Sequence, residues 1–162
     1  QTSNINPDAY RPKKSKVPLQ DGAQRLIIAT CEKGTVEDIG DMRVIKGGLD
    51  AKGDVHEKIY DVAVSGGRKI GRDGRCKTPV GSTVDVADAS YTNTIGTSLL
   101  AAYWKDPDFD PQQRAFYYVR VIEIPTPRWT AYDAKFFGVE MPEGTAMVIQ
   151  DRAYTSPIWY TP

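Results

Sequence analysis

The sequence contains few side chains that could carry out acid–base chemistry or bind a transition metal. His56 is the only histidine among the 162 residues, so a metal site built from several imidazoles is excluded. One imidazole can still act as a general base. However, His56 lies in the run Asp54-Val55-His56-Glu57, which has the character of a strand start. We therefore expect an exposed histidine at a turn rather than a catalytic residue.

The densest group of carboxylates lies in Asp106-Pro107-Asp108-Phe109-Asp110, where aspartates alternate as in the first half of a calcium-binding loop. The EF-hand pattern fails, because Pro111 takes the place of its glycine and Tyr117 the place of its bidentate glutamate. Asp106, Asp108 and Asp110 remain candidate ligands of a looser calcium site. The interpretation that we favour is that Asp110-Pro111 caps a short turn between two strands.

Two cysteines, Cys31 and Cys76, are compatible either with one disulfide in an exported protein or with two buried thiols. Neither belongs to a C-x-x-C pair, so a zinc knuckle is unsupported. A basic, glycine-rich loop over residues 66–77 could cradle a phosphate. It lacks the spacing of a P-loop, and no long apolar helix follows it, so the pattern favours a solvated turn.

The overall composition limits the classes of partner. Basic and acidic residues number 21 each, giving a net charge of zero. Because a general polyanion binder normally has a basic excess, nucleic acid is disfavoured as a partner. No apolar run approaches the ~18 residues needed for a membrane span. We expect a flexible, basic, proline-containing tail or linker over residues 1–22, followed by one domain over residues 23–162.

Short β-branched or aromatic runs between turn residues predict about seven strands in that domain. They lie at 25–30, 42–46, 57–64, 80–86, 97–105, 116–124 and 158–160. Both faces of the strand at 116–124 are apolar enough to be covered. Arg120 on this strand therefore needs a carboxylate or backbone partner.

One late helix is predicted, with Thr126-Pro127 as its cap and first residue and Gly138 as its end. Aromatic residues recur within it near helical spacing, which predicts a stripe that faces the core. These residues are Trp129, Tyr132, Phe136 and Phe137. The elements together predict a mainly β protein: an antiparallel β-sandwich-like domain with one short helix.

Several long motifs in consistent order also carry a family resemblance. They are Val44–Asp50, Glu57–Ala63, Val80–Asp85, Tyr91–Gly96, Asp106–Arg120, Glu123–Thr130 and Arg152–Pro162. Over residues 24–162 the chain resembles the C-terminal region of the domain-of-unknown-function family 3604. That family consists of large, mostly exported bacterial proteins related to metal-dependent phosphoesterases of the polymerase-and-histidinol-phosphatase (PHP) type.

The resemblance implies a non-catalytic C-terminal β-domain or fragment. The family's metal ligands lie in an upstream domain, so none transfers to this chain, and no cofactor of its own is expected. The domain would pack on that metallohydrolase domain or chain, in the periplasm or outside the cell. The docking elements would include Arg128, Trp129, Ser156, Pro157 and Trp159. The alternatives are a stand-alone exported structural subunit that self-assembles, and a small enzyme that uses His56 or the acidic loop.

Overall fold

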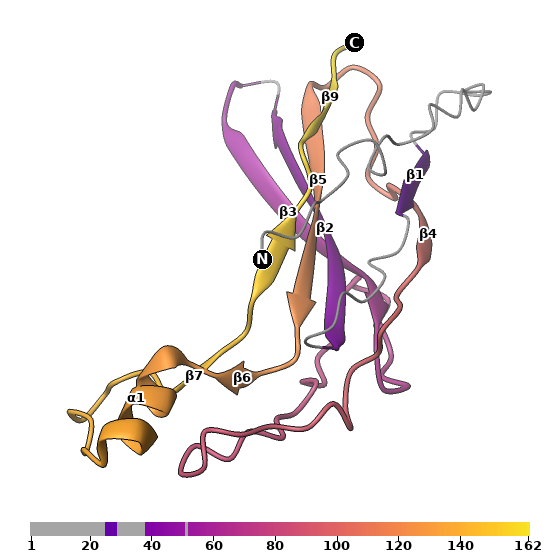
Figure 1. The fold of residues 1–162 in the computed structure, drawn as a ribbon. Helices are drawn as coiled ribbons and strands as arrows, with labels where there is room; N and C mark the ends of the chain where they lie inside the picture. Colours follow the sequence, from indigo (N-terminus) through magenta and orange to yellow (C-terminus); the bar gives the residue numbers. More distant parts are fainter. Residues whose placement is uncertain (1–24, 29–37, 51) are drawn as a thin grey trace, which may run out of the picture.

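The computed structural model describes residues 25–28, 38–50 and 52–162, and is organised around one antiparallel sheet (Figure 1). The three long strands are β2 (Ile39–Leu49), β3 (Val55–Val64) and β5 (Ala115–Glu123). β2 lies between β3 and β5. The two short strands β8 (Arg152–Tyr154) and β9 (Ile158–Tyr160) pair with opposite ends of β5. The tail predicted over residues 1–22 lies outside the described residues.

The hydrophobic core lies on one face of this sheet, because apolar side chains alternate along β2 and β5. Met42 and Val44 are fully buried, and Tyr117 and Val119 on β5 are nearly so. The second layer over this face is smaller. It includes β4 (Ala102–Lys105), which pairs with β1 (Arg25–Ile28). The prediction of a mainly β, antiparallel, sandwich-like domain is confirmed.

An arm leaves the sheet after β5. It consists of β6 (Thr126–Pro127), the helix α1 (Trp129–Phe137) and β7 (Val148–Ile149), which pairs with β6. The predicted end of the helix is correct, because Gly138 takes a left-handed conformation with φ of 63°. The predicted start is wrong. Proline suits an edge strand as well as a first helical turn, and here Thr126 and Pro127 form β6.

The prediction that the helix turns its aromatic stripe toward the core is also wrong. Phe136 is 82% exposed and Trp129 is 62% exposed, whereas the buried residues of α1 are the small Thr130 and Ala131. The helix lies at the end of the arm, beyond the sheet (Figure 1). Its aromatic face therefore does not meet the core among the described residues.

The strand predicted at 80–86 does not form, and the one predicted at 97–105 shortens to β4. Residues 80–96 hold one isolated antiparallel bridge among themselves, Asp85 with Ser90. Polar side chains there bond to the backbone in place of a ladder. The Thr83 hydroxyl donates to the Thr92 carbonyl at 2.6 Å, and the Val84 N–H donates to the Ser82 hydroxyl at 3.2 Å.

The first prediction concerns Gly96, which has φ of 85°. A Cβ there would lie 2.6 Å from Ile124 Cγ2 and 2.7 Å from Asp38 Cβ. Gly53 is a matched control, because its φ is 87° but nothing lies within 4 Å of its Cβ position. Gly53→Ala should cost about 1 kcal/mol of unfolding free energy through backbone strain alone. Gly96→Ala should cost a further ~1–3 kcal/mol from overpacking, measured by urea denaturation. Equal losses would contradict this packing.

Candidate functional site

The acidic segment is held on the sheet by a buried carboxylate. Asp106 accepts hydrogen bonds from Lys46 Nζ at 2.6 Å and from the Tyr117 hydroxyl at 2.7 Å. Lys46 and Tyr117 lie directly opposite each other on β2 and β5. The Asp106 side chain is fully buried, and that of Lys46 is 16% exposed. We call these three residues the Asp106 latch.

A second carboxylate extends the latch toward solvent. Asp108 accepts hydrogen bonds from Lys58 Nζ and from the Tyr60 hydroxyl. The bond from Lys58 is the main cause that lowers the pKa of Asp108. Burial, followed by the bond to the neighbouring carboxylate, raises the pKa of both Tyr60 and Tyr117. Both tyrosines therefore remain neutral donors rather than becoming general bases near neutral pH.

The three candidate calcium ligands have separate partners in this arrangement. Asp110 accepts a hydrogen bond from the Gln112 N–H at 2.8 Å, so it caps a turn. Asp106 and Asp108 each face a lysine. In the described part of the chain, no group of three or more His, Cys, Asp or Glu side chains is placed to hold a metal ion. The arrangement agrees with the capping interpretation and gives the calcium interpretation no support.

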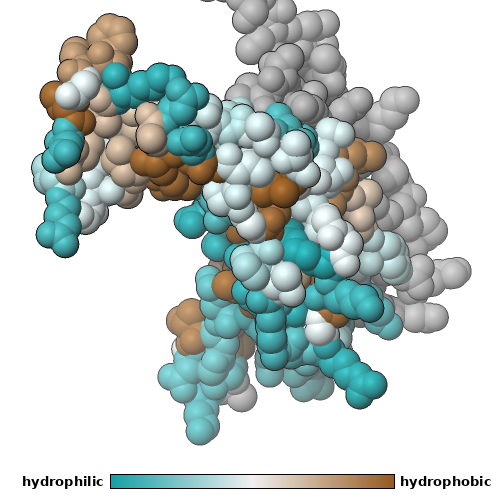
Figure 2. Space-filling view, turned by 90° about the horizontal axis from the view of Figure 1, so that it is seen from below, coloured by the Kyte–Doolittle hydropathy of each residue, from teal (hydrophilic) through white to brown (hydrophobic). Residues whose placement is uncertain are grey.

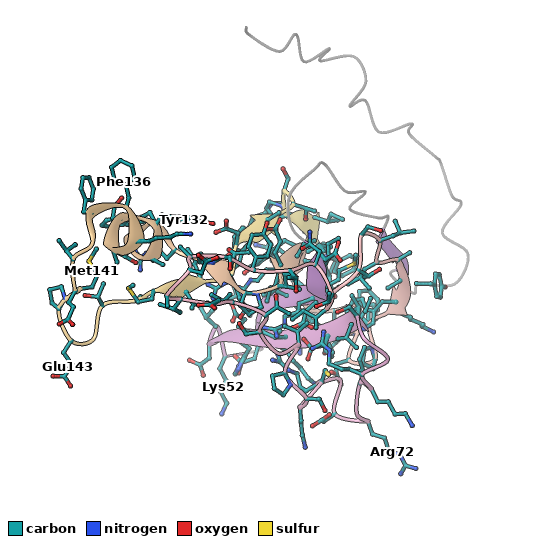
Figure 3. The ribbon with its side chains drawn as sticks, turned by 60° about the horizontal axis from the view of Figure 1, so that its bottom comes forward. Lys52, Arg72, Tyr132, Phe136, Met141 and Glu143 are labelled. Carbon is teal, nitrogen blue, oxygen red and sulfur yellow. The ribbon has the colours of Figure 1, made fainter. Side chains whose placement is uncertain are left out.

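Two of the five cations in the basic loop at 66–77 pair with carboxylates on the strands of the sheet. Arg68 Nη2 lies 2.6 Å from Asp41 Oδ1, and Arg75 Nε lies 3.3 Å from the buried Asp61. Lys77 pairs with Asp73 at 3.3 Å on the surface. Arg72, in contrast, extends away from the body (Figure 3). The loop is thus tied down by ion pairs rather than arranged around an anion.

His56 and Cys76 each make contacts with residues nearby in the sequence. His56 lies near the start of β3 with its side chain 65% exposed, and its Nε2 is 3.0 Å from Asp50 Oδ2. Cys76 is partly buried, and its thiol contacts the Thr78 carbonyl at 3.4 Å. Cys31, the other cysteine of the candidate disulfide, lies outside the described residues.

The candidate docking residues fall into two separate places. Arg128 and Trp129 lie on the arm, beyond the end of β5. Ser156, Pro157 and Trp159 lie near β9, which pairs with the beginning of β5. Figure 1 shows α1 and β9 at opposite ends of the molecule. The structure therefore does not bring the two groups together.

The arm presents an apolar surface. We call Trp129, Tyr132, Phe136 and Phe137 the arm aromatics; they are 47–82% exposed. Figure 2 shows hydrophobic residues on the lobe that contains α1, and in Figure 3 Phe136 points away from the rest of the molecule. Beside the helix is a cavity of about 460 Å³, whose lining includes Val86, Val139 and Met141.

A second aromatic surface, which the sequence pattern did not indicate as open, lies on the sheet face opposite the core. It consists of Phe116, Tyr118, Tyr154 and Trp159, and we call it the β5 aromatic face. The ring centres of Phe116 and Trp159 are 5.1 Å apart, and those of Tyr118 and Tyr154 are 6.2 Å apart. The exposed fractions of Trp159 and Tyr154 are 71% and 56%. The sequence pattern predicts that both faces of β5 are covered, whereas within the described ranges Trp159 and Tyr154 on this face are exposed.

A family model described as "Protein of unknown function (DUF3604)" matches residues 14–162. The chain belongs to this family. The match covers the latch, both aromatic surfaces and all the candidate docking residues of this DUF3604 chain. Neither the comparison with curated proteins nor the comparison with solved structures finds a match. No helix in the described ranges has the length and apolarity to cross a membrane.

The Asp106 latch should be a major source of stability in this DUF3604 chain. Asp106→Ala leaves the Lys46 ammonium and the Tyr117 hydroxyl without their acceptor, so it should cost about 3 kcal/mol or more of unfolding free energy. Replacing both ions by apolar residues, Lys46→Met with Asp106→Leu, should cost less than Asp106→Ala alone. Urea denaturation of the two variants measures this. A double variant as unstable as Asp106→Ala would contradict the explanation.

The ion pair between Asp108 and Lys58 should make the unfolding free energy depend on pH in the acid range. Because folding lowers the pKa of Asp108 below its ordinary value of 3.8, its contribution is present above that value and is lost as pH falls through the folded pKa. Asp108→Asn should therefore lower stability at pH 7 by up to ~1 kcal/mol. The difference from wild type should shrink below about pH 4. Thermal unfolding of wild type and Asp108→Asn at several pH values measures this. In a Lys58→Met background, Asp108→Asn should change stability at pH 7 much less than it does in wild type.

Proposed function

We propose that this DUF3604 chain is a non-catalytic β-domain that packs on the catalytic domain of a PHP-like metal-dependent hydrolase. In this proposal the chain acts in the periplasm or outside the cell, as the resemblance implies. The observation that carries the proposal is the arm, which holds four large aromatic side chains in solvent. Its candidate partner is the metallohydrolase domain that the family resemblance places upstream.

The arm aromatics are available for docking because the arm does not use them for its own folding. The helix is anchored by small residues and polar bonds: the Thr130 hydroxyl donates to the Ala146 carbonyl at 2.5 Å, and the Arg128 N–H donates to the Met147 carbonyl at 2.9 Å. Contiguous exposed apolar patches on soluble proteins mark interaction sites. Fully burying each large apolar side chain contributes ~1.5–3 kcal/mol. Four such groups can support a stable domain contact.

The attachment of the arm also favours a docking role. Lys135 Nζ on α1 lies 2.7 Å from Asp88 Oδ1, which ties the helix to the segment between β3 and β4. This ion pair fixes the helix through a residue that is not one of the arm aromatics. The adjacent cavity of about 460 Å³ adds a concave feature that an apolar side chain of the partner can enter.

A double variant, Phe136→Ser with Phe137→Ser, should separate docking from folding. Both residues are mostly exposed, so unfolding free energy should change by less than ~0.5 kcal/mol. Tagged protein from the native source should carry an EDTA-sensitive hydrolase activity toward p-nitrophenyl phosphate, and the double variant should lose most of it. Tyr103→Ser is the matched control, because Tyr103 is 65% exposed on β4, away from the arm.

An intact-mass measurement shows whether the hydrolase is a separate chain or part of the same polypeptide. If the hydrolase domain is part of the same polypeptide, a protease should cleave between the two domains faster in the double variant than in wild type. Wild-type material with no associated hydrolase would contradict the proposal.

The alternative, a self-assembling subunit, is favoured by the outer edge of β3. Along that edge Val55 is 80% exposed, and among the named strands β3 pairs with β2 alone. Unpaired strand edges can add a strand from another molecule. Light scattering distinguishes the two functions, because an ordered homo-oligomer without hydrolase favours self-assembly.

A further inference from the structure

Arg120 occupies an unusual position on the β5 aromatic face. It lies on β5 directly opposite Arg43 of β2 on one side and Tyr154 of β8 on the other. Arg43 is neutralised, since it lies 3.0 Å from an oxygen of Asp41 and 2.7 Å from one of Asp61. No carboxylate pairs with Arg120 within the described ranges.

The contacts of Arg120 are weak for a guanidinium. Its Nη2 donates to the Tyr118 hydroxyl at 3.3 Å, and its Cζ lies 5.4 Å from the centre of the Tyr154 ring. Its Nε is buried without a hydrogen-bond partner. A buried donor without an acceptor destabilises the fold. The Arg120 guanidinium also carries a charge that no carboxylate of the described residues balances, and a carboxylate brought by a partner would neutralise it.

The surroundings of Arg120 have the composition of an interface centre. Arginine, tryptophan and tyrosine are the residues most enriched among binding hot spots, where a ring of packed side chains excludes water from a central contact. Here Tyr118 and Tyr154 flank Arg120 directly, and Phe116 with Trp159 continues the apolar surface. Excluding water around a guanidinium strengthens its bond to a carboxylate.

A cavity of about 380 Å³ lies at the far end of the same face, and its lining includes Leu49, Phe116 and Trp159. Phe116 and Arg120 are four residues apart on β5, which is roughly 13 Å along a strand. The face therefore combines an apolar hollow with a cation at a fixed separation. A surface that fits both carries an apolar side chain and a carboxylate about that far apart.

We propose that Arg120 binds an aspartate or glutamate side chain on the domain that covers the β5 aromatic face. The inference rests on the proposed function, in that the covering domain is the metallohydrolase domain. An apolar side chain of that domain fills the hollow beside Trp159. Arg120 is thus the specificity-determining contact of a second docking surface, separate from the arm.

The test places a photo-crosslinking residue, p-benzoylphenylalanine, at Tyr118 of the tagged protein in its native source. Mass spectrometry then identifies the captured segment. We expect a segment of the hydrolase domain with Asp or Glu within a few residues of the crosslink. Arg120→Met should lower the yield about tenfold or more. Arg120→Lys should restore part of it, because lysine keeps the charge but loses the two-pronged bond.

Arg152→Met is the matched control. Arg152 is an exposed arginine that pairs with Ile122 on the same face, so its removal should change the yield less than twofold. The inference is overturned if a folded Arg120→Met protein crosslinks like wild type. It is also overturned if the captured segment lacks a carboxylate or belongs to a second copy of this chain, or if Tyr118 captures nothing. Capture of an acidic segment from a domain without metal-dependent hydrolase activity supports the role of Arg120 and contradicts the proposed function.

Discussion

The core face of the sheet depends on the hydrogen bonds that the buried Asp106 carboxylate accepts from Lys46 and Tyr117. These bonds fix the segment after β4 against the middle of the sheet. β4, which leads into that segment, holds Trp104 with its ring centre 4.9 Å from that of Tyr60 and 6.3 Å from that of Tyr117. The core is thus closed by an aromatic cluster whose position is set by an ion pair. Because a buried ion without its partner is costly, the segment cannot leave the sheet cheaply.

The two faces of the sheet therefore differ in what remains for other molecules. On the core face the charges of Lys46, Lys58 and Asp108 are paired within the chain. On the other face, ion pairs of Asp41 and Asp61 hold the loop after β3, but this loop leaves the β5 end of the face open. Most charged groups of the interior serve the fold. Two of the surfaces that remain, the arm aromatics and the β5 aromatic face, are rich in exposed aromatic side chains.

The alternation of neighbouring residues was enough to predict the long strands. It was not enough to predict features that depend on contacts between residues far apart in the sequence. Alternation located β2, β3 and β5, and Pro157 correctly marked the start of β9. The arm was misjudged because helical spacing reports which residues share a face, not whether a core lies beside that face. The Asp106 latch joins residues 60 positions apart, so no short motif announces it. Between Met42 and Arg43 the pairing of β2 with β3 shifts by one residue and leaves Val62 without a partner on β2. Nothing in the sequence predicts this shift.

The separation of the two aromatic surfaces limits the kind of partner that can use both. The arm follows the end of β5, and Trp159 pairs beside its beginning. Nine residues of extended strand lie between them, or roughly 30 Å. An extended peptide of about nine residues spans this distance, whereas a small ligand cannot cover both surfaces. A folded domain of ordinary size can, since 30 Å is about the width of a small domain. If one molecule occupies both surfaces, it must present apolar side chains over that whole span, and we favour a packed neighbouring domain over a small free ligand.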